Sequence, residues 1–253
     1  MTLDAATFGI LWPALLAGLL VTATHVPLGM QVLKRGIVFI DLAVAQIAGL
    51  GVIVADRLGF EPQGVAVQVA ALCAALSGAL LLNWTDKRWP EVQEAVIGVT
   101  FIVAANAAIL LLATNPHGAE NLKDLLVGQI LWADPARLVL IAALYAAILG
   151  LWFGLRERVG RVGFYLLFAC AVTASVQLVG VYLVFTTLIV PALATRNLAR
   201  WQLAAGYGLG ALGYAAGLGV SLVSDLPPGP LIVCIMTLLG IAVFLTFRPR
   251  IPT

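Results

Sequence analysis

The chain has 253 residues, of which 62% are hydrophobic and only 10% are charged, and its formal net charge is +2. Soluble domains carry about 25% charged residues, so this composition cannot cover a water-facing surface and excludes an ordinary soluble protein. The small net charge gives no indication of nucleic-acid binding. We therefore expect an all-α, polytopic membrane protein that forms a single transmembrane domain over residues 1–253.

Eight apolar runs are candidates for membrane helices, since a helix needs roughly 20 residues to cross a bilayer. The run from Gly163 to Leu193 is too long for one crossing and short for two. A break between Gln177 and Gly180 would divide it, because Gly weakens a helix and Gln prefers a protein-lined site. The chain thus has eight or nine crossings. The runs are Phe8–Leu28, Gly36–Ala55, Gly64–Trp84, Ala95–Thr114, Ala136–Leu155, Gly163–Leu193, Gln202–Val223 and Pro230–Phe247.

The basic residues decide between these arrangements, because Lys and Arg concentrate in cytoplasmic loops. With the N-terminus outside and nine crossings, three of the 14 basic residues lie outside. With eight crossings, four more change to the outer side. We predict nine crossings in the lipid of a prokaryotic cytoplasmic (inner) membrane, with the N-terminus out and the C-terminus in. The basic residues then inside are Lys34, Arg35, Lys87, Arg88, Arg156, Arg158, Arg161, Arg196, Arg200, Arg248 and Arg250.

Asp41 is the acid whose position most needs a reason. It follows Gly36 by five residues, which places it about 7 to 8 Å along a membrane helix. An acid at that depth usually faces a cavity, a substrate path or a partner, so we predict a functional role. The alternative is a structural one, in which Asp41 pairs with Lys34 or Arg35 or hydrogen-bonds to a neighbouring helix.

The segment Asn115–Pro135 carries leucines at helical spacing and predicts an amphipathic helix in the outer interface. His117, Glu120 and Asp124 are spaced i, i+3, i+7 within it. An imidazole and two carboxylates on one face suit Zn²⁺ or Mn²⁺. The alternative is that Gly118 breaks this face, and that the acids are there because the start of a helix favours negative charge.

The stretch Leu178–Arg200 predicts a contact with a cytoplasmic partner. Pro191 can end one helix and start a short second one at the membrane face. The residues that follow are small or polar and would allow a partner to approach closely. The predicted contact residues are Pro191, Ala192, Ala194, Thr195 and Arg196.

Four segments in register resemble the permease subunit of the metal-ion ABC importers, the zinc, manganese and iron uptake family. They are VPLGMQVLKRGIVFIDLAVAQIAGLG, EAVIGVTF, VGVYLVFTTLIVPALATR and DLPPGPLIV. The resemblance covers nearly the whole chain. It implies an all-helical, type II-like ABC importer permease that imports a divalent metal, zinc first and manganese or iron otherwise.

The resemblance also implies the partners: a homodimer of this chain, a separate cytoplasmic ATP-binding subunit, and a metal-binding receptor protein outside. The helix after Pro191 would couple to the ATPase. ATP would bind only to the partner subunit, so this chain is not expected to be an enzyme or to hold a cofactor. It also lacks the phosphate-binding pattern GxxxxGK[ST].

One departure concerns the metal path. The family commonly has a histidine four residues after the acid that matches Asp41, and Ala45 stands there instead, next to Gln46. The HGAENLKD segment is then an alternative source of ligands. Two other functions compete with the permease: a stand-alone channel or secondary carrier, and an intramembrane enzyme. A carrier would usually show more buried charges and an inverted repeat, and an enzyme would need a paired catalytic site.

Overall fold

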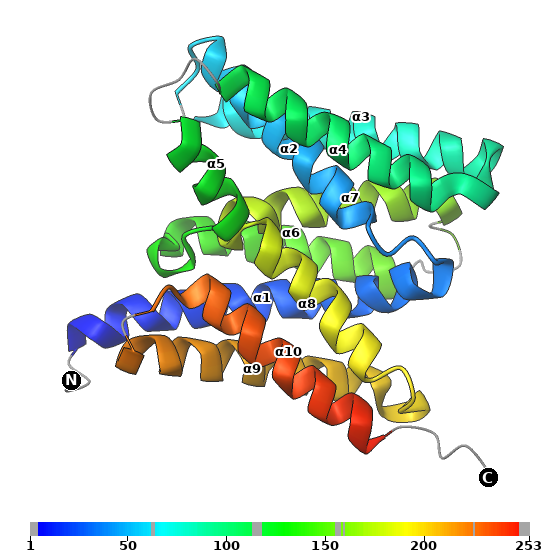
Figure 1. Cartoon of the computed structure of the whole chain (residues 1–253). Coiled ribbons are helices and arrows are strands. Elements are labelled where there is room, and N and C mark those ends of the chain that lie inside the picture. Colours follow the sequence, from blue (N-terminus) through cyan, green and yellow to red (C-terminus); the bar gives the residue numbers. More distant parts are fainter. Residues whose placement is uncertain are drawn as a thin grey trace. The chain divides into compact units, whose positions relative to one another are not determined.

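The computed structural model describes residues 5–61, 64–112, 118–154, 158, 160–224 and 226–247, and every regular element among them is a helix. This confirms the all-α expectation. Three short 3-10 helices, η1 (Pro90–Val92), η2 (Ile130–Trp132) and η3 (Ala199–Trp201), stand between longer ones (Figure 1). The α-helices are α1 (Ala5–Arg35), α2 (Ile40–Arg57), α3 (Val65–Arg88), α4 (Gln93–Leu112), α5 (Gly118–Val127), α6 (Pro135–Gly154), α7 (Gly160–Val179), α8 (Val181–Ala194), α9 (Gln202–Ser224) and α10 (Pro228–Thr246).

The chain folds into two compact units that alternate along the sequence. Unit 1 comprises Met1–Arg35, Val127–Ala146 and Leu178–Thr253, and unit 2 comprises Gly36–Leu126 and Ala147–Gln177. Neither unit is a continuous stretch. The expectation of a single domain over the whole chain stays a prediction.

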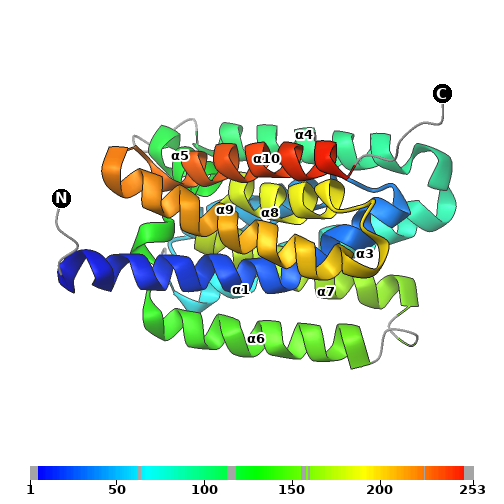
Figure 2. The same cartoon turned by 90° about the horizontal axis from the view of Figure 1, so that it is seen from below.

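Unit 1 is organised around α1, α8, α9 and α10. Helix α8 packs on α1, α9 and α10, and α9 packs on α1 and α10 (Figure 2). Glycines on α9 permit this close packing, as expected for helices in lipid. A Cβ added to Gly210 would lie 2.6 Å from Cγ2 of Thr22 on α1, and one added to Gly217 would lie 2.7 Å from Cα of Ile232 on α10.

Unit 2 is organised around α2, which packs on both α3 and α4 (Figure 1). Ile53 of α2 shares a buried apolar cluster with Ala108 and Leu112 of α4. At the other end of these helices, the backbone N–H of Phe39 donates to Oε1 of Glu94 over 3.3 Å. Most of helix α7 belongs to this unit, and the ring of its Phe164 lies tilted against the ring of Trp152 on α6.

Seven helices in the described part of the chain are long and apolar enough to cross a membrane, which confirms a polytopic membrane protein. Two of the predicted crossings do not reach that standard. Helix α2 carries Asp41, Asp56 and Arg57 within its 18 residues, and α8 has only 14 residues. The direction of insertion and the number of crossings stay predictions.

The long run is divided where the sequence predicted. Helix α7 ends at Val179 and α8 begins at Val181, and Gly180 between them has φ +82°. L-residues with a side chain rarely adopt that conformation. Gly180 also lies against the backbone of Gly128, whose φ is +72°. Two backbones meet here at a distance that no Cβ permits, so the break requires glycine on both sides.

The prediction at Pro191 was wrong. Pro191 lies inside α8, which continues to Ala194, and no separate short helix starts there. The proline is in the last turn of the helix, and prolines are tolerated in membrane helices because neighbouring groups re-satisfy the freed backbone. Helix α1 gives two further examples, Pro13 and Pro27.

Candidate functional site

The end of α8 is buried, against the expectation that it faces a partner. Ala192 is fully buried and Ala194 is 3% exposed. A Cβ built on Gly29 of α1 would lie 3.4 Å from the Cβ of Ala192, and one built on Gly240 of α10 would lie 3.7 Å from that of Ala194. The small residues here serve packing within unit 1, because they let α8 approach two neighbouring helices.

Thr195 is also buried, and Pro191 with it. The hydroxyl of Thr195 donates to the backbone carbonyl of Pro191 over 2.7 Å, and its backbone N–H reaches the same carbonyl over 3.1 Å. These bonds close the last turn of α8. Of the five residues predicted to contact the partner, only Arg196 is exposed.

The exposed surface lies one step further along the chain, in the segment Arg196–Trp201, which we call the α8–α9 turn. Arg196, Asn197, Ala199 and Arg200 are exposed, and Trp201 is 65% exposed. Ala199 has φ +37°, the one positive φ of a non-glycine residue in the described part of the chain. Such backbone strain persists only where the surrounding structure holds it, and it is common at functional sites.

Two cations of the α8–α9 turn stack on aromatic rings. The guanidinium carbon of Arg196 lies 4.9 Å from the ring centre of Phe244 on α10, and that of Arg200 lies 5.8 Å from the ring of Trp201. Cation–π contact orients a guanidinium without neutralising it. The turn therefore presents two positive charges and a tryptophan on the surface of unit 1. Arg, Trp and Tyr dominate the binding energy of protein interfaces, so this composition suits a protein partner.

In unit 2, the start of α2 holds the acid singled out from the sequence. Asp41 is 1% exposed, and neither carboxylate oxygen has a hydrogen-bond partner among the described residues. Gln46, one turn further on, is 3% exposed, and its carbonyl oxygen also has no partner there. Ala45, four residues after Asp41, is also buried. An ion pair with Lys34 or Arg35 stays untested, since those residues belong to unit 1.

A buried carboxylate without a partner is costly, because burial removes the water that solvated its charge. The cost falls if the group is protonated or if a cation lies against it. Asp41 with Gln46 supplies the oxygen atoms that hard divalent cations accept.

His25 of α1 was not predicted as a site residue. It is fully buried, and its Nδ1 lies 3.1 Å from the carbonyl of Val21 and 3.0 Å from the hydroxyl of Thr24. Its Nε2 has no partner in the described part of the chain. Because the Val21 carbonyl can only accept, it favours the tautomer with hydrogen on Nδ1 and a free lone pair on Nε2. A histidine inside an apolar helix was the sequence signal that could have identified His25 as a candidate site residue.

The structure describes only part of the predicted external metal site. Helix α5 exists and confirms the predicted amphipathic helix, but it begins at Gly118. His117 lies outside the described residues, and so does the side chain of Glu120. Asp124 is exposed and has an interaction partner. No group of three metal-binding side chains occurs among the described residues, and the His117, Glu120 and Asp124 site stays a prediction.

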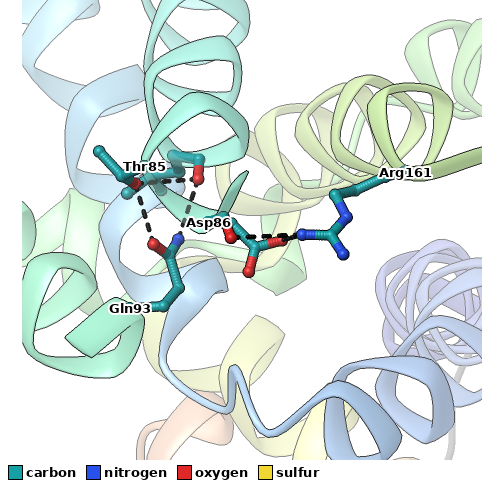
Figure 3. Close-up of polar contacts among 5 residues, drawn as sticks. Thr85, Asp86, Gln93 and Arg161 are labelled. Carbon is teal, nitrogen blue, oxygen red and sulfur yellow. Dashed lines mark hydrogen bonds and ion pairs between the residues drawn. The ribbon is translucent and has the colours of Figure 1, made fainter. Parts of the chain in front are cut away.

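A polar cluster fixes the α3–α4 connection of unit 2 (Figure 3). The hydroxyl of Thr85 donates to Oε1 of Gln93 over 2.9 Å, while Nε2 of Gln93 donates to the carbonyl of Leu82 over 2.9 Å. Arg161 of α7 donates to Oδ2 of Asp86 over 2.8 Å and to its carbonyl over 3.3 Å. These contacts hold the ends of α3, α4 and α7 together. Because these side chains bond to one another and to backbone carbonyls at the helix ends, the cluster serves structure.

Comparisons with known proteins agree with this architecture. A model of the ABC 3 transport family matches residues 7–159 and 152–247. An uncharacterized membrane protein of Synechocystis sp. is 25% identical over 257 aligned residues, which cover 93% of this chain and 89% of that protein.

Two solved structures share the fold. PsaBC from Streptococcus pneumoniae in complex with Fab has a TM-score of 0.76 at 18% identity, covering 94% of this chain and 92% of that chain. An inward-facing conformation of a metal-chelate type ABC transporter has a TM-score of 0.71 at 15% identity, covering 98% of this chain and 89% of that chain. Identities this low establish a common fold and nothing finer.

Proposed function

Because the chain belongs to the ABC 3 transport family, we propose that it is the membrane subunit of an ATP-driven importer of a divalent metal ion. Zinc is the first candidate for the cargo, with manganese or iron as alternatives. The chain would act as a homodimer with a separate cytoplasmic ATPase, and would receive metal from a receptor protein outside. One structural neighbour, a metal-chelate type ABC transporter, supports this reading.

The observation that supports a metal ion as the cargo is the buried carboxylate of Asp41, which has no hydrogen-bond partner among the described residues. A membrane protein of a transport family has buried an acid with no described partner, and a transiting cation would offset that cost. With Ala45 in place of the family histidine, oxygen atoms of Asp41 and Gln46 would replace the imidazole.

The ATPase would dock on the α8–α9 turn. We assign its contact to the exposed residues Arg196, Asn197, Arg200 and Trp201, with Pro191, Ala192, Ala194 and Thr195 supporting them from inside unit 1. Closure of the ATPase would pull on this turn, and α8 would carry the displacement along its length to the break at Gly180. This placement replaces a helix after Pro191 with a turn after Ala194.

The test is uptake of radioactive zinc and manganese by lipid vesicles that contain the chain with its co-purifying ATPase, in the presence of the metal-binding receptor protein and with or without ATP on the ATPase side. Asp41→Asn keeps the shape of the side chain and removes its charge. We expect it to lower uptake per assembled complex by at least about 10-fold, since one charge-assisted contact of about 1.5–3 kcal/mol is lost. Asp56→Asn, at the other end of α2, is the matched control and should transport normally.

A purely structural Asp41 predicts a different result. In that case Asp41→Asn would change the yield and thermal stability of the complex, while the surviving complexes would transport at the normal rate per molecule. Uptake that does not depend on ATP would instead favour a stand-alone channel or carrier. Either outcome contradicts the corresponding part of the proposal.

A further inference from the structure

The last turns of α3, in unit 2, carry an exposed stripe that changes from apolar to charged. Leu80 (47%), Leu81 (49%) and Trp84 (53%) are about half exposed, and Arg88 is exposed at the end of the helix. These residues follow one another at spacings of three or four, so they lie on one face of the helix. The stripe therefore runs from aliphatic side chains through an indole to a guanidinium.

At the charged end of the stripe, a cation lies against a pair of aromatic rings. The ring centres of Trp84 and Trp89 lie 5.2 Å apart in a T-shaped pair, and the guanidinium carbon of Arg88 lies 5.9 Å from the ring centre of Trp89. Such stacking orients a guanidinium and leaves its charge intact. Lys87 is exposed next to Arg88 and adds a second cation. We call Trp84, Lys87, Arg88 and Trp89 the Trp84–Trp89 cluster.

The acid nearest in sequence does not neutralise this cluster. Asp86 has a side chain that is only 17% exposed, and it accepts a hydrogen bond from Arg161 of α7 over 2.8 Å (Figure 3). Glu91 on η1 is exposed and is the opposing charge closest along the chain. Among the described residues, neither Lys87 nor Arg88 forms an ion pair. Both cations are therefore available to an anion.

The polar atoms of the cluster side chains are all hydrogen-bond donors. A lysine carries three donor hydrogens, an arginine five and each indole one, and none of these groups accepts. Within the described part of the chain, these four side chains donate to no other residue. An anion with several acceptor oxygens is their complement, and arginine and lysine both bind phosphate.

We propose that the Trp84–Trp89 cluster binds the headgroup of an anionic phospholipid. The phosphate lies against Lys87 and Arg88, the indoles lie at the level of the glycerol, where tryptophans concentrate in membranes, and an acyl chain follows Leu80 and Leu81. A free phosphate would use the cations but not the apolar part of the stripe. The inference does not depend on the cargo or on the ATPase.

A second exposed tryptophan with an arginine nearby in sequence supplies the comparison. Trp132 of η2 is exposed, and Arg137 follows it by five residues at the start of α6. Nε of Arg137 lies 3.9 Å from Oδ2 of Asp134, so this cation already has an acid beside it. Arg137 therefore has less to gain from a phosphate, and we expect no selection of anionic lipid there.

Native mass spectrometry of the full chain in a neutral detergent tests the proposal. Phosphatidylglycerol and phosphatidylcholine with the same acyl chains both carry a phosphate, but only the first has a net charge. We expect phosphatidylglycerol to bind at least about 10-fold more tightly. Replacing both Lys87 and Arg88 by glutamine should weaken its binding about 30-fold, since each basic residue near a membrane surface contributes about 5-fold. Arg137→Gln is the matched control and should bind as wild type does.

Two further changes separate the charge of the site from its aromatic part. Glu91→Gln removes the opposing charge and should tighten the binding of phosphatidylglycerol at least about 2-fold. Trp84→Leu keeps the stripe apolar and removes one indole donor, so it should weaken the binding of both lipids about 3-fold. A phosphatidylglycerol with a photoreactive group in its headgroup should label residues 80–92.

Each contrary outcome overturns a stated part of the proposal. Equal affinity for the two lipids, or equal losses in the double variant and in Arg137→Gln, overturns a selective anionic site. Labelling elsewhere overturns its location, and displacement of phosphatidylglycerol by millimolar inorganic phosphate overturns a lipid as the occupant. If the double variant unfolds at a lower temperature than wild type, Arg88→Gln alone decides. It must weaken binding while Glu91→Gln strengthens it, and shifts in the same direction contradict the site.

Discussion

The end of α8 and the α8–α9 turn are neighbours in the sequence, but they present opposite surfaces. Ala192, Ala194 and Thr195 are packed against α1, α9 and α10, whereas Arg196, Arg200 and Trp201 are exposed. The sequence pattern of small residues after a proline predicted a docking surface in the first region. The structure places small residues where helices of the same chain meet, and leaves charged and aromatic residues exposed.

The largest effect that separates the two regions is expected from Ala194→Glu. A docking role for Ala194 would leave this variant folded and uncoupled from the ATPase. Burial inside unit 1 predicts instead that the variant fails to fold, because an unpaired buried charge costs about 3–5 kcal/mol. The measurement is the yield of monodisperse protein after extraction from the membrane. Arg196→Glu, two residues further on and exposed, is the control and should extract normally.

A smaller effect is expected from Thr195→Val, which keeps the shape and removes the hydroxyl. The bond from Thr195 to the Pro191 carbonyl is lost, and a hydrogen bond of this kind contributes about 1 kcal/mol to stability. Thermal unfolding of the purified chain should shift down by a few degrees. ATPase binding should not change, and a large loss of binding with unchanged unfolding would return Thr195 to the docking surface.

The smallest effect is expected from Ala199→Gly. Glycine adopts the positive φ of this residue without steric strain, which costs an L-residue about 1–2 kcal/mol, but it loses more entropy on folding. The net result should be a stabilisation of less than about 1 kcal/mol. Ala215→Gly on the exposed face of α9 is the matched control and should destabilise by about 1 kcal/mol, as glycine does inside helices. Equal destabilisation by both changes would contradict a strained turn.

Several features could be read from the sequence because they depend on local chemistry. The apolar runs predicted the helices, and the Gln177–Gly180 stretch predicted the break between α7 and α8. The apolar and charged sides of α5 predicted an amphipathic helix, although its start at Gly118 leaves His117 outside it.

Other features depend on which way a side chain faces, and the sequence does not contain that direction. Pro191 reads as a helix breaker until its place in the last turn of α8 is known. Ala194 reads as a docking residue until Gly240 is found beside it.

The most direct test of the α8–α9 turn as the docking surface is the affinity of the co-purifying ATPase subunit for the chain in lipid nanodiscs. The affinity is compared between wild type and Arg200→Glu. The charge reversal lies on the α8–α9 turn, where Arg200 is exposed beside Trp201. An arginine that is a hot spot of an interface costs about 2 kcal/mol or more when it is lost, so we predict a loss of at least about 30-fold with unchanged thermal unfolding. Equal affinity of the two proteins would contradict the assignment of this turn to the ATPase.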